Sequence, residues 1–344
     1  MMIPHSRPTI DKNDIQAVTT VLASGHIARG EKVREFEAVV AKFIGVKYAV
    51  ACSSGTSALH LALLGLGIGK GDEVIIPSFV CPSPYLAVMH ARGVPKIADI
   101  DAENLNISAK TAKPRISKKT KAIVVPHMFG NPADINGLLD LGIPVIEDCA
   151  QSLGAEYKNR RIGSFGDLSI FSFYATKMIT TGEGGMVLTD NYDFYAKIVE
   201  MRDYDKKSLN PSRYNYKLTD FQAALGLSQI NKLSAFIERR RKLASLYSSR
   251  LMKHGVRTQK HNQGSVFYRY VIFIDHLLSI QKRFKEAGLM CERPIFYPLH
   301  KSLLTEKCPN SNWAFEHALS IPIYPSLTNE EVNHILRMFD SVLA

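Results

Sequence analysis

A lysine lies in a glycine-rich turn between two predicted strands. Residues 168–173 form a continuous apolar run that indicates a buried strand, and Lys177 follows it, before the glycines of residues 182–185 lead into the next strand. Partial desolvation lowers the pKa of a lysine amine and makes it a nucleophile, as in lysines that form Schiff bases. The alternative is an exposed hairpin lysine whose neighbouring glycines serve the turn, and spacing alone leaves both open.

Two acids end another apolar run, at residues 145–148. In α/β proteins ligands bind where strands end, so an acid in this place is well situated to meet a ligand. Pyridoxal phosphate needs a carboxylate beside its ring nitrogen, because that nitrogen must stay protonated for the ring to accept electrons. Asp148 is a candidate for this carboxylate, and Gln151 is near enough in sequence to reach the other ring substituents. Asp148 could equally cap the start of a helix.

Small polar residues join a predicted strand, residues 48–52, to a predicted helix, residues 56–66. The free N–H groups and the dipole at the start of a helix bind anions, and the hydroxyl groups of Thr56 and Ser57 add donors. A helix start that is capped but carries no ligand is the alternative. The segment matches neither the phosphate loop of ATP-binding proteins nor the GxGxxG pattern of dinucleotide-binding proteins, so neither nucleotide is indicated.

These three features occur along the chain in the order phosphate cradle, acid and lysine. Each feature is weak by itself, because each has an ordinary structural alternative. Together they supply the three contacts that pyridoxal phosphate requires, to its phosphate, its ring nitrogen and its aldehyde. The sequence therefore predicts pyridoxal 5'-phosphate as the cofactor and no metal.

The elements that must position these residues alternate between strands and helices in the first half of the chain. Several of the strands are continuously apolar, which is typical of strands buried on both faces, so we predict an α/β fold with a mainly parallel sheet. The predicted strands are residues 48–52, 74–77, 96–100, 121–126, 144–148, 168–173 and 185–188, and the predicted helices between them include residues 56–66, 85–91 and 135–141.

The second half begins with a long helical pattern, residues 219–254, that leaves room for one break. A strand at residues 266–274, a helix at 278–287 and a last helix from residue 330 follow. We predict three parts: an N-terminal arm (1–35), a large cofactor-binding α/β domain (36–240) and a small C-terminal α+β domain (241–344). The arm contains one predicted helix, at residues 11–23.

Composition limits the classes of protein. The chain has 344 residues and a formal net charge of +11, which suits either nucleic acid or an anionic small molecule. The basic run at residues 239–242 has no interleaved aromatic residues and no helix-turn-helix pattern accompanies it, so we predict no nucleic-acid partner. No apolar stretch approaches the roughly 20 residues that cross a bilayer, and no signal-peptide pattern opens the chain. Five scattered cysteines favour a reducing compartment, so we predict a cytoplasmic protein.

The chain resembles the DegT/DnrJ/EryC1/StrS family of pyridoxal-phosphate-dependent sugar aminotransferases. This resemblance implies the type I fold, that of aspartate aminotransferase, with a mainly parallel sheet and a smaller C-terminal domain. The matching motifs run nearly end to end and lie at residues 30–36, 54–62, 71–77, 127–133, 145–151, 161–167, 172–185, 214–226 and 319–325.

The resemblance also implies a role for individual residues. Lys177 forms the Schiff base with the cofactor and then moves protons, Asp148 pairs with the pyridinium nitrogen, and Gln151 lies near the phenolic oxygen. Asn215 reaches the phosphate of the neighbouring subunit, so the active unit is a homodimer with shared sites. The cofactor-binding residues implied in this way are Gly55, Thr56, Asp148, Gln151, Ser172, Lys177 and Asn215. A lysine rather than a histidine at position 177 favours transamination over the dehydration of a related branch.

The chain departs from the family pattern at three places. Cys81 stands where an aromatic residue often stacks on the cofactor, and either the thiol packs there or a neighbour such as Phe79 replaces it. Lys217 stands where the family usually has arginine, which changes the geometry of phosphate binding. The segment with Tyr297 and His300 resembles the substrate-side loop without its usual leading histidine. Lys217, Tyr297 and His300 are therefore the candidate substrate contacts.

The function implied by the resemblance is the transfer of an amino group, from glutamate, to a keto-sugar carried by a nucleoside diphosphate. The product would be an amino sugar for a surface polysaccharide. The alternatives are amination of a keto-cyclitol or another ketone without a nucleotide, and a non-catalytic regulator or scaffold. The net charge of +11 is compatible with a doubly anionic carrier.

Overall fold

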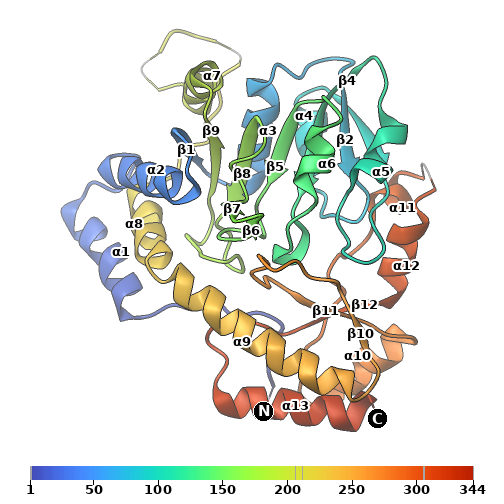
Figure 1. Cartoon of the computed structure of the whole chain (residues 1–344). Helices are drawn as coiled ribbons and strands as arrows, with labels where there is room; N and C mark the ends of the chain where they lie inside the picture. Colours follow the sequence, from blue (N-terminus) through green and yellow to red (C-terminus); the bar gives the residue numbers. More distant parts are fainter. Residues whose placement is uncertain (1, 206, 211, 305–306, 344) are drawn as a thin grey trace.

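The computed structural model describes residues 2–205, 207–210, 212–304 and 307–343 (Figure 1). Its centre is a seven-stranded sheet with the order β1-β9-β8-β5-β4-β2-β3. Strand β9 is antiparallel to both of its neighbours, and the other six strands run in one direction, so the prediction of a mainly parallel α/β sheet is confirmed. The strands are β1 (Tyr48–Cys52), β2 (Glu73–Pro77), β3 (Val94–Ala98), β4 (Thr120–Pro126), β5 (Val145–Asp148), β8 (Leu168–Ser172) and β9 (Gly185–Thr189).

Helices cover both faces of this sheet, which is why its strands are continuously apolar. Successive strand residues point to opposite faces, so Val74 and Ile76 join one core while Ile75 joins another. The first face carries α3 (Gly55–Gly65), α4 (Ser83–His90) and α7 (Tyr192–Arg202). The second face carries α2 (Glu31–Ile44), α5 (Ala109–Ala112), α6 (Ile135–Leu139) and α8 (Asp220–Ile230).

The C-terminal part has its own core around a three-stranded antiparallel sheet. In Figure 1, the long helix α9 runs beneath the large sheet, and α13 lies on the far side of α9. The predicted boundary at residue 240 lies within α9. The elements of this part are α9 (Leu233–Met252), β10 (Arg257–Thr258), β11 (Tyr270–Phe273), α10 (Leu277–Glu286), α11 (Leu299–Leu303), α12 (Pro309–His317), β12 (Ala318–Ile321) and α13 (Asn329–Leu343).

The N-terminal arm contacts both the C-terminal part and a helix that covers the large sheet. The Ile3 N–H donates to the Gly288 carbonyl at 2.8 Å, and the Ile3 carbonyl accepts from Met290 at 3.0 Å. The arm then continues into α1 (Lys12–Ser24), which packs on α8. The start of the arm therefore lies beside the C-terminal part, in which the chain also ends (Figure 1).

The long helical run and the strand predicted after it both occur, the strand in a shorter form. The helical run divides into α8 and α9 at residues 231–232, and the prediction allowed for one break without placing it. The strand predicted at residues 266–274 is shortened to β11, because Val266 and Arg269 donate their N–H groups to the loop at residues 129–130 instead. A short hairpin pairs β6 (Glu156–Tyr157) with β7 (Arg160–Arg161).

Within the described residues, no helix is both long and apolar enough to span a membrane.

Candidate active site

The candidate site lies at the edge where the parallel strands of the large sheet end. Six strands share one direction, so their carboxyl ends meet at this edge, where α/β proteins bind ligands. β1 leads here to Ser54 and the start of α3, β5 ends in Asp148, and β8 ends in Ser172. Lys177 lies on the turn that follows β8. The fold thus brings three distant sequence motifs to one place.

The start of α3 forms an anion cradle together with Ser172. The Ser54 hydroxyl accepts the Ser57 N–H at 3.1 Å. The N–H groups of Gly55 and Thr56 have no acceptor inside the helix, because they lie at its start. An ideal Cβ atom on Gly55 would lie 2.8 Å from Ser172 Cβ and 3.1 Å from its Oγ. Glycine therefore lets the Ser172 hydroxyl approach the N–H groups of the helix, and the pair fits a phosphate group.

Strand pairing holds the two halves of the cradle together. Gly185 of β9 lies opposite both Cys52 of β1 and Ser172 of β8. A Cβ atom on Gly185 would lie 2.1 Å from the Ser54 carbonyl oxygen, so only glycine leaves room for the turn into α3. One of the glycines after Lys177, Gly185, thus leaves the space that the turn into α3 needs.

The two acids at the end of β5 have different partners. The Glu147 carboxylate accepts hydrogen bonds from His127 Nε2 at 3.1 Å and from the N–H groups of Gly163, Phe165 and Gly166 at 3.0, 2.7 and 2.8 Å. Burial by itself would raise the pKa of Glu147, but these donors lower it below its usual value. Glu147 is therefore a buried, ionised structural group that fixes the loop at residues 163–166.

His127, Glu147 and Cys149 place their ligand atoms within 4.8 Å of one another, which makes them a geometric candidate for a metal site. The lone pairs that a metal needs are already engaged, because His127 Nδ1 accepts the Ala133 N–H at 3.1 Å and Glu147 accepts four donors. Burial also raises the pKa of the Cys149 thiol well above its usual value, which disfavours the thiolate that would bind a metal. The group is a structural network.

Asp148 is buried and only partly satisfied by the protein. Its Oδ1 accepts the Ala150 N–H at 3.0 Å, yet a turn rather than a helix follows, so it is not a helix cap. Burial raises the pKa of Asp148, and the Ala150 N–H and the charges of Lys177 and His127 only partly oppose this effect. A cationic N–H partner would restore the carboxylate. A protonated pyridine nitrogen is such a partner, so this site fits the cofactor predicted from the sequence.

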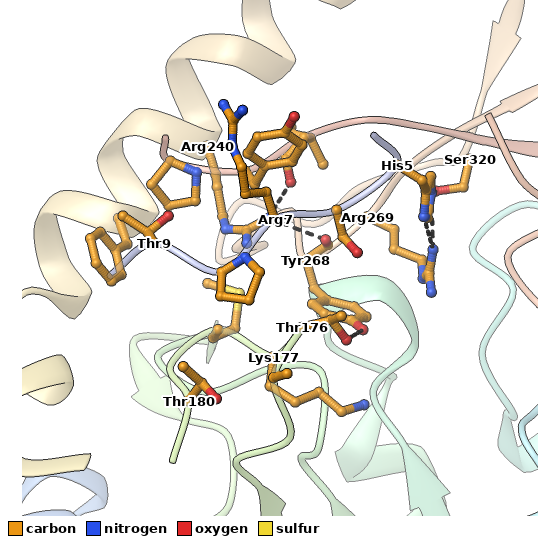
Figure 2. Close-up of a pocket in the computed structure, with 18 of the residues that line it drawn as sticks. His5, Arg7, Thr9, Thr176, Lys177, Thr180, Arg240, Tyr268, Arg269 and Ser320 are labelled. Atoms are coloured by element: carbon orange, nitrogen blue, oxygen red, sulfur yellow. Dashed lines mark hydrogen bonds between the residues drawn. The ribbon is translucent and has the colours of Figure 1, made fainter. Parts of the chain in front are cut away.

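Lys177 is half-buried on a closed turn, not an exposed hairpin lysine. Its N–H donates to the Tyr174 carbonyl at 2.9 Å, and Thr181 donates to the Phe173 carbonyl at 2.9 Å to close the loop. Its Nζ lies 5.2 Å from the centroid of the Tyr268 ring. Figure 2 shows the lysine side chain extending past Thr176 and Tyr268. Its charge acts on the pKa of Asp148, so the two side chains lie in the same part of the site.

Gln151 connects the site to the loop after β4. Its Oε1 accepts the N–H of Phe129 at 2.8 Å, and Phe129 has a φ of 62° in the left-handed region. The hydrogen bond therefore stabilises an unusual backbone conformation beside the site. It also leaves the Gln151 amide nitrogen free of protein acceptors among the described residues.

Cys81 and Phe79, the two candidates for the ring-stacking position, lie in different environments. Phe79 has an exposed fraction of 0% and packs on Phe129 with ring centroids 6.4 Å apart, so it has no surface to offer a cofactor. Cys81 is exposed, and it lies close enough to Lys177 and Asp148 for both charges to act on the pKa of its thiol. Cys81 is therefore the side chain that faces this part of the site.

Lys217, a candidate substrate contact, is ion-paired in the isolated chain. Its Nζ lies 3.2 Å from Asp203 Oδ1 and 2.7 Å from Asp205 Oδ2. Partial burial would lower the pKa of Lys217, but the two carboxylates raise it above its usual value. Lys217 is thus a charged ammonium group, two residues after Asn215 in the chain.

The other two substrate candidates are in different environments. His300 is buried, and its ring nitrogens bond to the Ser78 hydroxyl and, at 3.0 Å, to Asn312 Oδ1. Tyr297 is 44% exposed and its ring lies against Phe315 at a centroid distance of 5.5 Å. In this conformation only Tyr297 of the pair presents surface to a ligand.

Asn215 is exposed between two tyrosines that anchor its segment. The rings of Tyr214 and Tyr216 stack at 5.0 Å, and the Tyr216 hydroxyl lies 3.2 Å from His60 Nδ1. Burial lowers the pKa of His60 to about 4, so its ring is neutral and packs between helix and segment. Asn215 does not reach the cradle of its own chain through any hydrogen bond among the described residues.

Sequence reasoning missed two residues of the site. Ser83 lies 2.9 Å, hydroxyl to hydroxyl, from Thr56, and Tyr268 lies over Lys177. Neither has a local spacing signal, because each comes from an element that only the fold brings close. The alternation of side chains along β5 was a usable signal for the separate roles of Glu147 and Asp148.

Known proteins are similar to this chain in sequence and in fold. A model of the DegT/DnrJ/EryC1/StrS aminotransferase family matches residues 8–340. GDP-perosamine synthase from Vibrio cholerae is 34% identical over 357 residues, which cover 97% of each chain. Among solved structures, the aminotransferase TlmJ from Streptoalloteichus hindustanus has a TM-score of 0.95 at 27% identity, with coverage of 100% of this chain and 99% of that chain. The PLP-form of the putative sugar aminotransferase Spr1654 from Streptococcus pneumoniae has a TM-score of 0.94 at 25% identity, with the same coverage.

Proposed function

The chain belongs to the DegT/DnrJ/EryC1/StrS aminotransferase family, and we propose that it transfers an amino group from glutamate to a keto-sugar carried by a nucleoside diphosphate. It is a sugar aminotransferase that depends on pyridoxal phosphate, so the predicted family, fold, type of enzyme and cofactor are confirmed. The donor, the carrier and the roles of individual residues are the content of the proposal.

The observation that carries the proposal is the meeting of Lys177 with Asp148 beside the Gly55–Ser172 cradle. When bound, pyridoxal phosphate supplies an aldehyde for amines and a protonated ring that accepts electrons. In our proposal Lys177 would hold the cofactor through its aldehyde carbon, whose oxygen leaves as water, and would hold or move the proton at its Nζ. Asp148 holds the proton at the ring nitrogen.

The remaining residues orient the cofactor. The N–H groups of Gly55 and Thr56 and the hydroxyl of Ser172 bind the phosphate, since they converge at a helix start. Gln151 directs its free amide group to the phenolic oxygen, because its carbonyl oxygen is already bonded to Phe129. Both assignments agree with the roles that the family resemblance implied.

A nucleotide-linked keto-sugar is the acceptor that the chemistry favours. The Vibrio cholerae relative is named for a GDP-linked amino sugar, and the present chain has a formal net charge of +11 that attracts a doubly anionic carrier. Lys217 and Tyr297 are the substrate contacts that we retain. His300 acts through Ser78 and Asn312 by holding the loop that carries Tyr297. An amino sugar for a surface polysaccharide would be the product.

We further propose a homodimer with shared sites in the cytoplasm. Asn215 is exposed and lacks a side-chain hydrogen bond among the described residues, which suits a contact to the cofactor phosphate of the partner. The five cysteines are free thiols, which suits a reducing compartment.

The test begins with the absorption spectrum of the purified protein after incubation with pyridoxal phosphate. A visible band that glutamate converts to the pyridoxamine form establishes Lys177 chemistry and the donor together, and Lys177→Ala should lack the band. Nucleotide-linked keto-sugars are then compared with free keto-sugars and keto-cyclitols as acceptors. Faster turnover of the free ketones would overturn the nucleotide carrier, and a persistently colourless protein would overturn the role of Lys177.

A further inference from the structure

The ring of Tyr268 faces the amine of Lys177. The two residues come from different parts of the chain, since Tyr268 follows α9 and Lys177 follows β8. Lys177 Nζ lies 5.2 Å from the ring centroid, and the Tyr268 hydroxyl lies 3.4 Å from the hydroxyl of Thr176 (Figure 2). The residue next to Lys177 thus also contacts the tyrosine that covers it.

Tyr268 is fixed in this place by its backbone. A Cβ atom on Gly130 would lie 2.7 Å from the Tyr268 nitrogen, so the two segments are in close contact. Arg240 Nη1 donates to the Tyr268 carbonyl at 3.2 Å and to the Ile323 carbonyl at 2.6 Å. The tyrosine is 7% exposed. A ring held this firmly can restrict the amine that lies against it.

Two cations lie near the Tyr268 ring, and a third donates to the Tyr268 carbonyl. Burial opposes its ionisation, but the charges of Lys177, Arg269 and Arg240, with the Thr176 hydroxyl, lower the pKa of Tyr268 to about 8. The Arg269 guanidinium, which lies 5.5 Å from the ring centroid, is itself bonded to the ring of His5. At Tyr270, two residues on, no cation of the described residues opposes the effect of burial, which raises the pKa of Tyr270 to about 12.

We propose that Tyr268 is a positioning residue for Lys177, whose ring face and hydroxyl favour the protonated amine and hold it toward the cofactor site. This inference rests on the proposed function, in which Lys177 takes up and releases a proton. An aromatic face attracts an ammonium group, and a partly ionised phenol strengthens that attraction. Tyr268 therefore acts on the amine of Lys177 through its ring and hydroxyl, without contact to the substrate.

The first experiment measures the pKa of Lys177 in the cofactor-free protein. The rate of acetylation of Lys177 by acetic anhydride is followed against pH by mass spectrometry, for the wild type, Tyr268→Phe and Tyr268→Leu. We expect the midpoint of the curve to fall by about 0.5 pH unit in Tyr268→Phe and by more in Tyr268→Leu, which also lacks the ring. Tyr270→Phe is the matched control, because it loses a buried hydroxyl away from Lys177, and its midpoint should not move.

The second experiment uses the enzyme reconstituted with pyridoxal phosphate. Single-turnover conversion by glutamate should slow about tenfold in Tyr268→Phe with little change in the concentration dependence on glutamate. Thr176→Val removes the hydroxyl partner of Tyr268 and should change the rate in the same direction. It provides the same test if Tyr268→Phe does not fold, as judged by circular dichroism.

The outcomes separate this inference from the proposed function. If the wild type forms no visible band with pyridoxal phosphate, the role of Lys177 fails and the inference fails with it. If the band forms but Tyr268→Phe matches the wild type in midpoint and rate, the inference alone is wrong. Equal shifts in Tyr268→Phe and Tyr270→Phe would also overturn it, because they would reflect a general loss of structure.

Discussion

An ideal Cβ atom on Gly55 would lie 2.8 Å from the Cβ atom of Ser172. Gly55 begins α3 and Ser172 ends β8, so this close approach joins a helix start to the end of a strand. The approach places the hydroxyl-bearing side chain of Ser172 beside the first residue of α3. The proposed phosphate cradle depends on the absence of one methyl group.

Gly55→Ala should therefore weaken cofactor binding. The added methyl group must displace Ser172 or the helix start, and overpacking of this kind costs about 1–3 kcal/mol. We expect the dissociation constant for pyridoxal phosphate to rise about tenfold or more, measured by titration of the visible band. Gly69→Ala is the control, because its nearest neighbouring atom lies 3.9 Å from the added Cβ position. Equal affinity of the two variants would contradict the cradle.

Asp148→Asn should have opposite effects with and without the cofactor. Burial raises the pKa of Asp148 in the folded protein above its value in the unfolded chain. Without cofactor, ionisation of this carboxyl group therefore lowers the free energy of unfolding as the pH rises above the unfolded-state pKa. The amide variant should therefore unfold at an equal or higher urea concentration at pH 7, and this advantage should vanish below pH 3.8. The same variant should bind pyridoxal phosphate more weakly and lose most activity. Lower stability of the cofactor-free variant at pH 7 would contradict this account of Asp148.

Glu147→Gln should destabilise the protein itself. The change places an amide N–H₂ group among donors that now bond to a carboxylate, and breaking a buried charged network costs about 3–5 kcal/mol. The pKa of Glu147 is lowered, so its contribution is fully present above about pH 4.5 and is lost as pH falls through the folded-state pKa. Urea unfolding at several pH values should show the difference from wild type shrinking in acid. Glu156→Gln, at an exposed ion pair with Arg161, should cost less than about 1 kcal/mol.

A mixture of two inactive variants tests the shared site. Lys177→Ala and Asn215→Ala each remove one proposed cofactor contact, and in our proposal these contacts come from different subunits. After subunit exchange, half of the dimers are mixed and each has one intact site, so activity should recover to about a quarter of wild type. The Lys177→Ala/Asn215→Ala double variant mixed with wild type is the control: its mixed dimers contain no intact shared site, so activity should fall on exchange from about half to about a quarter of wild type. No recovery in the first mixture, with exchange verified by mass spectrometry, would place both contacts in one subunit.

The sequence located much of the site because its signals were local. Lys177, Asp148 and the segment that starts at Ser54 each follow a strand, and strands in a parallel sheet end at one edge. β1 was predicted with its observed bounds, and the other strands of the large sheet differ by one or two residues at their ends. Apolar runs and small-residue turns depend on neighbours in the chain, so they are visible without the fold.

The tertiary structure alone decided the relations between distant residues. No pattern along the chain shows that Phe79 is fully buried, that Lys217 is ion-paired to Asp203, or that Tyr268 covers Lys177. Burial and electrostatic environment are set by which surfaces come together in space. The sequence by itself therefore determined the family and the cofactor, and it indicated the motifs that we propose to hold that cofactor. Only the packing of the C-terminal part against the large sheet determined the surroundings of the lysine amine.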